Sequence, residues 1–128
     1  MQRDNRTSEL RLGQDIADRL RGLAEMALKV ACTVPRASPY RHLAQQLARA
    51  GTAAGANYEG ARAAESRADF IHNVLLATKE LREALYWLRL ARAANLVPVP
   101  LVERAIDEAD QLTRILGASA RTARQNAP

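Results

Sequence analysis

The strongest constraint on the fold is a helical repeat of apolar residues in the second half of the chain. Apolar side chains recur there at alternating steps of four and three residues, at Phe70, Val74, Ala77, Leu81, Ala84, Leu88 and Ala91. Because an α-helix turns once in 3.6 residues, this spacing gathers all of them on one face. The pattern predicts a long amphipathic helix with one continuous core face.

Three more stripes of the same period occupy the rest of the chain. The first consists of Ile16, Leu20, Leu23, Ala27, Val30 and Val34, and the second of Leu43, Leu47, Ala50, Ala54, Tyr58 and Ala61. The last consists of Leu101, Val102, Ile106, Ala109, Leu112 and Leu116. The segments "TVPRASPY" and "LVPVP" separate them, since proline denies the preceding residue the α region. Ser38 before Pro39 is the expected cap of the second helix.

These stripes predict an all-α fold, an up-and-down antiparallel four-helix bundle in one domain over residues 1–128. Alanine, leucine, arginine and glutamate form helices readily, whereas six glycines and five prolines are too few for a small β sandwich. Residues 1–8 and 118–128 are expected to be flexible tails. Gly117 is the expected early stop or fraying point of the last helix.

Two features predict how the second and third helices meet their neighbours. Gly51 and Gly55 share one face of the second helix, where they would let another backbone approach closely. Ser66 and Asp69 have the spacing of a capping box, so the second helix is expected to end near residues 61–64 and the third to start at Ser66. Asp69 would also lie near the positive end of the new helix.

The third helix carries a second stripe on nearly the opposite face. Its members, at steps of three and four, are Leu76, Lys79, Glu83, Tyr86 and Leu90, with Trp87 beside them. A helix that is apolar on two sides is normally buried on two sides, yet a helix of a four-helix monomer needs only one buried face. The second stripe therefore predicts an interface between subunits, for which tryptophan and tyrosine are favoured residues.

The charges in this stripe have two interpretations. Lys79 and Glu83 are four residues apart, so they can form a solvated ion pair on one helix. If the stripe is buried in an interface, Lys79, Glu80 and Glu83 instead need charged partners, such as arginines of another subunit. Such pairs would fix the register of the subunits rather than add stability.

The net charge of +5 is spread unevenly along the chain. One basic zone, with Lys29, lies between Glu25 and Glu59, and the other follows Asp110. Two such zones can form an electrostatic footprint for RNA or DNA, and the candidate contacts are Arg36, Arg41, Arg49, Arg114, Arg121 and Arg124. A solvated basic surface is the alternative, and the tail lacks the interleaved aromatic residues of a single-strand platform.

Residues suited to catalysis, cofactors or metals are sparse. A di-iron bundle needs paired Glu-x-x-His motifs, but only His72 follows an acid, Asp69, at that spacing. Cys32 has no histidine nearby in the sequence and is expected to be a small buried thiol. The chain also lacks a glycine-rich phosphate loop. We therefore expect no enzyme activity, no cofactor, no metal and no small-molecule substrate.

The cysteine count and hydropathy predict the compartment. A single cysteine excludes an internal disulfide and favours a reducing environment. No apolar run approaches the roughly 18 residues of a membrane span, and the first ten residues lack the apolar core of a signal peptide. We expect a soluble, cytoplasmic protein without membrane contact.

The run "GANYEGARAAESRADFIHNVLLATKELREALYWLRLA" resembles the signature region of the four-helix bundle proteins related to the 23S rRNA intervening-sequence protein. The matching positions are Ala56, Asn57, Tyr58, Ala64, Glu65, Ser66, Asp69, Phe70, Lys79, Glu80, Glu83, Tyr86, Trp87 and Leu88. The likeness continues more loosely into the first and last helices. This chain departs from the family pattern at Gly60, where glutamate is usual, and at Asn73, where lysine is common.

The resemblance implies a bundle that assembles into a homo-oligomeric ring of five. Relatives include the accessory protein of diversity-generating retroelements, a basic pentamer that binds nucleic acid and a reverse transcriptase. Members encoded within ribosomal RNA insertions have no established activity. We therefore expect a non-enzymatic homo-oligomeric scaffold, with a basic RNA- or DNA-binding accessory protein as the alternative. Asn57, Tyr58 and Glu65 would be helix-junction residues with interface contacts.

Overall fold

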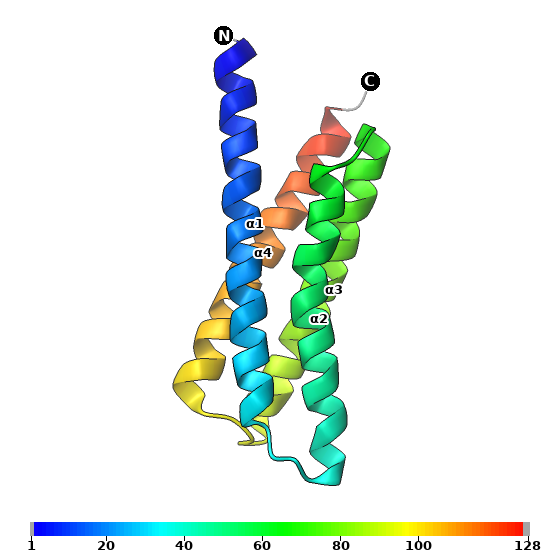
Figure 1. The fold of residues 1–128 in the computed structure, drawn as a ribbon. Coiled ribbons are helices and arrows are strands. Elements are labelled where there is room, and N and C mark those ends of the chain that lie inside the picture. The colour runs from blue at the N-terminus through cyan, green and yellow to red at the C-terminus, as the bar shows by residue number, and fades with distance from the viewer. Residues whose placement is uncertain (1, 127–128) are drawn as a thin grey trace.

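Four helices make up the computed structural model, which describes residues 2–126 and the side chains of residues 5–126. In chain order they are α1 (Gln2–Thr33), α2 (Ser38–Arg62), α3 (Arg67–Ala93) and α4 (Val99–Gln125). Consecutive helices run in opposite directions, and α1 packs beside both α2 and α4, as α3 does (Figure 1). Thus α1 and α3 occupy opposite corners of the bundle. The prediction of an all-α, up-and-down four-helix bundle is confirmed.

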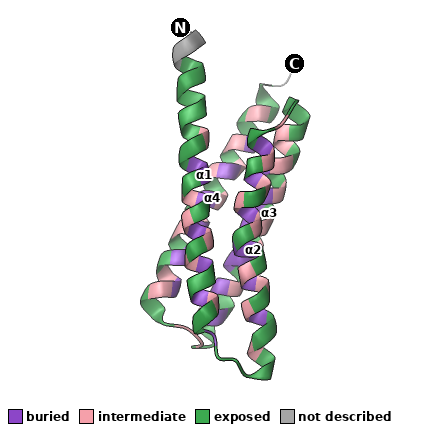
Figure 2. Cartoon of the chain, viewed as in Figure 1, coloured by how far each residue is buried: buried purple, intermediate pink, exposed green. Residues whose placement is uncertain are grey.

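The core is formed by the four predicted stripes. Every member of the first two stripes is buried, and so are the members of the third and fourth apart from Phe70 and Leu101, which are half-buried. Buried positions alternate with exposed ones along each helix, as Figure 2 shows. Among the described residues, ten leucine and valine side chains from all four helices are completely inaccessible to solvent: Leu20, Leu23, Val30, Leu47, Val74, Leu81, Leu88, Val102, Leu112 and Leu116.

The last helix is longer than expected. It continues through Gly117 to Gln125, so the expected early stop at Gly117 is wrong. The reason is Ala120, which lies one turn after Leu116 on the same face and is buried, so that packing favours continued helix. Residues 2–8 and 118–125 are likewise helical, and the mobility of both ends stays a prediction. Residues 1, 127 and 128 lie outside the described part.

The α2–α3 turn is closed by the predicted cap. The Ser66 hydroxyl accepts a hydrogen bond from the Asp69 backbone N–H at 3.1 Å, which satisfies one of the free donors at the start of α3. The Asp69 carboxylate accepts a hydrogen bond from the Asn73 side chain at 3.1 Å. At the start of α2, by contrast, the N-cap is Ala37, and the expected capping role of Ser38 is wrong because Ser38 is already helical.

Replacing Ser66 with alanine should lower the free energy of unfolding by about 1 kcal/mol, because the Asp69 N–H would lose its acceptor. Urea unfolding followed by circular dichroism measures this change. Ser8→Ala is the matched control, since Ser8 is an exposed residue inside α1. Its expected effect lies within about 0.5 kcal/mol of zero. Equal effects of the two substitutions would contradict the capping role.

Close packing of α2 on α1 depends on one of the two predicted glycines. A Cβ atom on Gly51 would lie 2.4 Å from the Cβ of Ala27, far inside van der Waals contact. A Cβ on Gly55 would lie 3.5 Å from the Cβ of Leu20, which is an ordinary contact. The predicted close approach is therefore confirmed at Gly51. No helix in the described range is long and apolar enough to cross a membrane.

Candidate interaction surfaces

The predicted second stripe of α3 lies on the surface of the bundle. Tyr86 is 57% exposed, Leu90 39% and the neighbouring Leu75 38%. Lys79 is exposed, whereas Leu76 and Glu83 are half-buried. We call Leu75, Leu76, Lys79, Tyr86 and Leu90 the outer face of α3. Three large apolar side chains on one solvent-facing helix surface are typical of an interaction site.

Trp87 lies at the edge of this face and joins it to α2. Its ring packs edge-to-face against Tyr86, with centroids 4.9 Å apart, and against His42 of α2, at 5.7 Å. The half-buried indole also packs against the core. Its Nε1 atom is buried and has no hydrogen-bond partner among the described residues. Trp87 is therefore partly a core residue that holds α3 on α2, in addition to its predicted place at the interface.

Glu80 and Glu83 share one arginine, Arg49 of α2. Its guanidinium contacts a Glu80 carboxylate oxygen at 3.0 Å and a Glu83 carboxylate oxygen at 2.5 Å. The expected partner, an arginine of another subunit, is thus corrected to one of the same chain. The alternative pair of Lys79 with Glu83 is not among the ion pairs of the described residues, where Glu83 contacts Arg49. These contacts cross from α2 to α3, so they hold the two helices in register.

The Arg49 guanidinium also changes the acidity of Glu83. Its hydrogen bond holds the pKa of Glu83 below the ordinary value, against the opposing effect of burial. The Trp87 indole N–H lies near the same carboxylate, outside hydrogen-bond geometry, and lowers the pKa further. The same hydrogen bond raises the pKa of Arg49. Both groups are therefore charged at neutral pH.

Acid should weaken the bundle partly through this pair. Because the pKa of Glu83 is lowered in the folded state, its contribution is present above the ordinary glutamate pKa and is lost as pH falls through the lowered value. Arg49→Met should therefore reduce the loss of unfolding free energy between pH 6 and pH 3. Urea unfolding at both values measures this, with Arg104→Met, an exposed change on α4, as the control. An unchanged acid dependence would contradict the role of the pair.

In the described part of the chain, two other arginines form ion pairs with carboxylates of a neighbouring helix. Arg19 of α1 binds Glu108 of α4 through two hydrogen bonds, at 2.5 and 3.1 Å, and Arg92 of α3 binds Glu103 of α4 at 3.0 Å. Arg114 contacts Asp110 on the same helix at 2.5 Å. Of the six predicted nucleic-acid contacts, Arg49 and Arg114 are therefore occupied by carboxylates.

The remaining predicted contacts are exposed but lie at opposite ends of the bundle. Arg36 and Arg41 are at the α1–α2 connection, whereas Arg121 and Arg124 are near the end of α4 (Figure 1). The structure therefore separates the two basic zones. A continuous nucleic-acid footprint would have to run along the length of the molecule.

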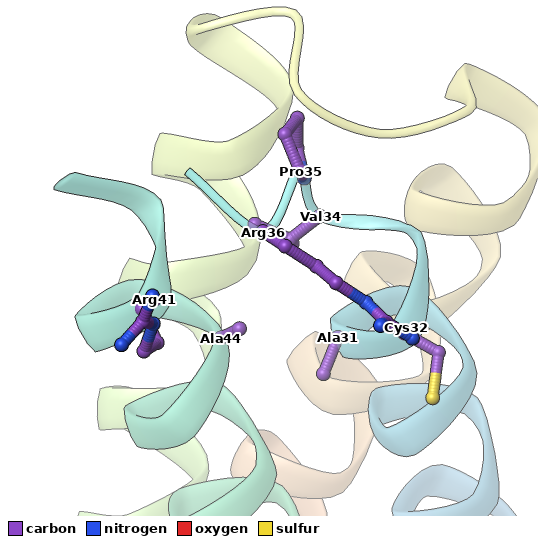
Figure 3. A pocket seen from close by; sticks show the side chains of 7 residues that line it. All are labelled: Ala31, Cys32, Val34, Pro35, Arg36, Arg41 and Ala44. Atoms are coloured by element: carbon purple, nitrogen blue, oxygen red, sulfur yellow. The ribbon is translucent and has the colours of Figure 1, made fainter. Parts of the chain in front are cut away.

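A shallow hollow of about 490 Å³ lies at the α1–α2 connection. It is lined by Ala31, Cys32, Val34, Pro35, Arg36, Arg41 and Ala44 (Figure 3). The Arg36 side chain extends across it toward Cys32, and Arg41 lies on the other side. Cys32 is exposed, so the expectation of a buried thiol is wrong. The reason is its position midway between the core residues Val30 and Val34, which directs it to the outer side of α1.

The family-motif residues have separate structural roles. Tyr58 is buried in the core, and its hydroxyl oxygen lies 3.7 Å from where a Cβ of Gly13 in α1 would stand. Burial raises the pKa of Tyr58. Asn57 is half-buried in α2, and Glu65 is exposed in the α2–α3 turn. Tyr58 is therefore a core residue, as its place in the second stripe predicts, rather than a helix-junction residue.

The two departures from the family pattern lie in contact with each other. A Cβ on Gly60 of α2 would stand only 2.7 Å from the amide oxygen of Asn73 in α3. Asn73 in turn donates to the Asp69 backbone carbonyl at 2.9 Å. The missing side chain at Gly60 thus leaves room for Asn73.

Clustered metal ligands are not seen in the described residues, where no three histidine, cysteine or carboxylate side chains come together. A second hollow, of about 270 Å³, lies between α1 and α2 and is lined mainly by small residues, among them Ala17, Ala24, Thr52, Gly55 and Ala56. Both hollows are open to solvent.

Comparison with known proteins supports the fold and the family pattern. The sequence profile of the family described as 23S rRNA-intervening sequence protein matches residues 14–118. A solved structure from Bacteroides thetaiotaomicron, a protein with unknown function from the S23 ribosomal protein family, is similar with a TM-score of 0.77 and 25% identity. The likeness covers 85% of this chain and 97% of that chain. No curated protein matches the sequence.

Proposed function

Because the chain belongs to the 23S rRNA-intervening sequence protein family, we propose that it is a non-enzymatic homo-oligomer that serves as a scaffold, with the outer face of α3 as its subunit interface. The observation that carries this proposal is the exposure of Leu75, Tyr86 and Leu90 on one helix whose opposite face is already buried in the core. An exposed apolar surface of this kind is stabilised when a second protein surface covers it.

The residue types at this face also support an interface. Tyrosine and tryptophan, here Tyr86 and Trp87, are among the residue types that most often contribute large binding energies. The number of subunits proposed is five, arranged in a ring, as the family resemblance implies.

The mass in solution tests this proposal directly. Light scattering behind a sizing column should give a multiple of the 14.1 kDa chain mass, and five times that mass for the proposed ring. The measurement should be made at low and at high salt. An apolar interface predicts that the assembly persists at high salt, because salt screens charges but not apolar contacts. A 14.1 kDa species at micromolar concentration would overturn the proposal.

A second function, binding of RNA or DNA, has its own supporting observation. Arg36 and Arg41 are exposed beside the start of α2, where no side chain caps the helix. Arginine and the start of a helix both favour phosphate groups. In a ring this surface would occur several times, so that weak contacts would add together.

Fluorescence anisotropy with a labelled 30-nucleotide single-stranded RNA tests this second function. Arg36→Glu with Arg41→Glu should lower the affinity at least about tenfold at 50 mM salt, and wild-type binding should weaken steeply with added salt. The control is Arg6→Glu with Arg104→Glu, which reverses the same number of charges at exposed positions outside the predicted contacts. A wild-type protein that leaves the RNA unbound would remove this function.

A further inference from the structure

A regular row of cations crosses the exposed side of α3. Lys79, Arg82, Tyr86 and Arg89 follow one another at steps of three, four and three residues, which keeps them on one side of the helix. All four are exposed. None of the three cations forms an ion pair within residues 5–126. We call these four residues the α3 row.

A row of opposite charge with the same spacing lies on α1. Asp15, Asp18, Gly22 and Glu25 also follow steps of three, four and three residues. The three acids are exposed, and their one ion pair in the described structure is the loose contact of Asp18 with Arg21, at 3.9 Å. A Cβ on Gly22 would meet no atom within 4 Å. We call these residues the α1 row. It offers three carboxylates around an open gap.

The bundle places the two rows on opposite sides of the molecule and in the same direction. α1 and α3 are at opposite corners, and both run away from the end that holds the N-terminus (Figure 1). Two copies side by side with parallel axes can therefore bring the α3 row of one against the α1 row of the next. In this register Lys79, Arg82 and Arg89 face Asp15, Asp18 and Glu25, because the spacings are identical.

The fourth position of each row fits the same register. Tyr86, which is 57% exposed, faces Gly22, where the absent side chain leaves space for the ring. The cations that flank the α1 row on the same side, Arg11 and Lys29, face Leu75 and Ala93, so no like charges meet there. By contrast, pairing α3 with α3 around a twofold axis would bring cations against cations, which is unfavourable.

We propose that the α1 row is the surface that receives the α3 row of the next copy, so that subunits associate head to tail. The inference rests on the proposed homo-oligomer and names the surface that its interface contacts. Two different surfaces that pair in this way generate a closed ring or an open filament, whereas a twofold pairing ends at a dimer. Charge complementarity would set the register, and Tyr86 with its apolar neighbours would contribute most of the affinity.

A charge-swap experiment tests the pairing. One variant reverses the α1 row with Asp18→Arg and Glu25→Arg, and a second reverses the α3 row with Arg82→Glu and Arg89→Glu. The third combines all four changes in one chain. Arg104→Glu with Arg121→Glu is the control, since both are exposed arginines of α4 and the change in charge equals that of the second variant. Circular dichroism first establishes that each variant is folded.

Analytical ultracentrifugation then measures the association of each variant. Either single-row variant should associate at least about tenfold more weakly than the wild type, because like charges now meet. The variant with all four substitutions should recover an affinity near that of the wild type. The control should leave association unchanged. Recovery of association in the variant with all four substitutions is the decisive result, since further substitutions would not repair a general loss of charge balance or of stability.

Three outcomes would overturn the pairing. If every variant associated as strongly as the wild type, the interface would not depend on these charges. Weakening by the α3 variant alone would mean that α3 contacts another surface, and loss of RNA binding by that variant with unchanged mass would assign the α3 row to nucleic acid. In each case the wild-type assembly would still exist, so the homo-oligomer proposal would stand. A monomeric wild-type protein would refute both.

Discussion

Tyr86→Ala combined with Leu90→Ala is expected to convert the assembly into folded monomers. The two side chains are 57% and 39% exposed in the single chain, so their removal takes little from the core. At the proposed interface they would be among the largest apolar contacts, and truncation of such residues typically costs about 2 kcal/mol or more each. The dissociation constant should therefore rise roughly a thousandfold.

The measurement combines light scattering with circular dichroism. The variant should elute at 14.1 kDa with a helical spectrum like that of the wild type. Val99→Ala is the control, because Val99 is 57% exposed at the start of α4 and lies on neither of the two proposed contact surfaces. An unchanged mass would contradict the interface, and so would a loss of helicity without any folded monomer.

Trp87 is less suitable for this test than the sequence suggests. In the sequence it stands beside Tyr86 and belongs to the same surface. In the structure its indole also packs against the core and against His42 of α2. Trp87→Ala would therefore weaken the α2–α3 contact, as well as any interface. Loss of assembly in that variant could follow from unfolding alone. Leu90 is 39% exposed, so its truncation tests the interface with little effect on the core.

The core could be predicted from the sequence because its determinants are local. A residue such as Leu81 is buried because it repeats at helical spacing with other apolar residues, and that spacing needs no knowledge of a partner helix. The capping bond of Ser66 is equally local, since its acceptor and donor lie three residues apart. The exposure of Cys32 could have been predicted in the same way, from its place off the Val30–Val34 stripe.

The charge contacts could not be predicted because they depend on the register between helices. Arg49 and Glu80 are 31 residues apart in the sequence. The pair forms because the packing of α2 against α3 brings the two residues to the same level along the bundle axis. Arg19 and Glu108 are 89 residues apart and depend on how α1 meets α4. Net charge and zones without acid describe how many cations are present. They do not tell which of them are neutralised within the fold.

Gly51→Ala is expected to destabilise the bundle although alanine favours helix more than glycine does. The new Cβ would stand 2.4 Å from the Cβ of Ala27, an atom that no rotamer change can move away. α1 and α2 must therefore separate, and overpacking of this kind costs about 1–3 kcal/mol. The helical preference of alanine offsets up to about 1 kcal/mol of that cost. A net loss of about 1–2 kcal/mol in unfolding free energy is expected.

Gly55→Ala is the matched control, because it makes the same change one turn later on α2. Its Cβ would meet the Cβ of Leu20 at 3.5 Å, so the helical preference should prevail and stability should be unchanged or slightly higher. Urea unfolding of both variants in the Tyr86→Ala, Leu90→Ala background keeps assembly out of the comparison. Adding Ala27→Gly to Gly51→Ala should cost less than the two changes summed, since the clash needs both methyl groups. Equal stability of the Gly51 and Gly55 variants would mean that α1 and α2 can separate freely at this crossing, and that close packing there does not hold the bundle together.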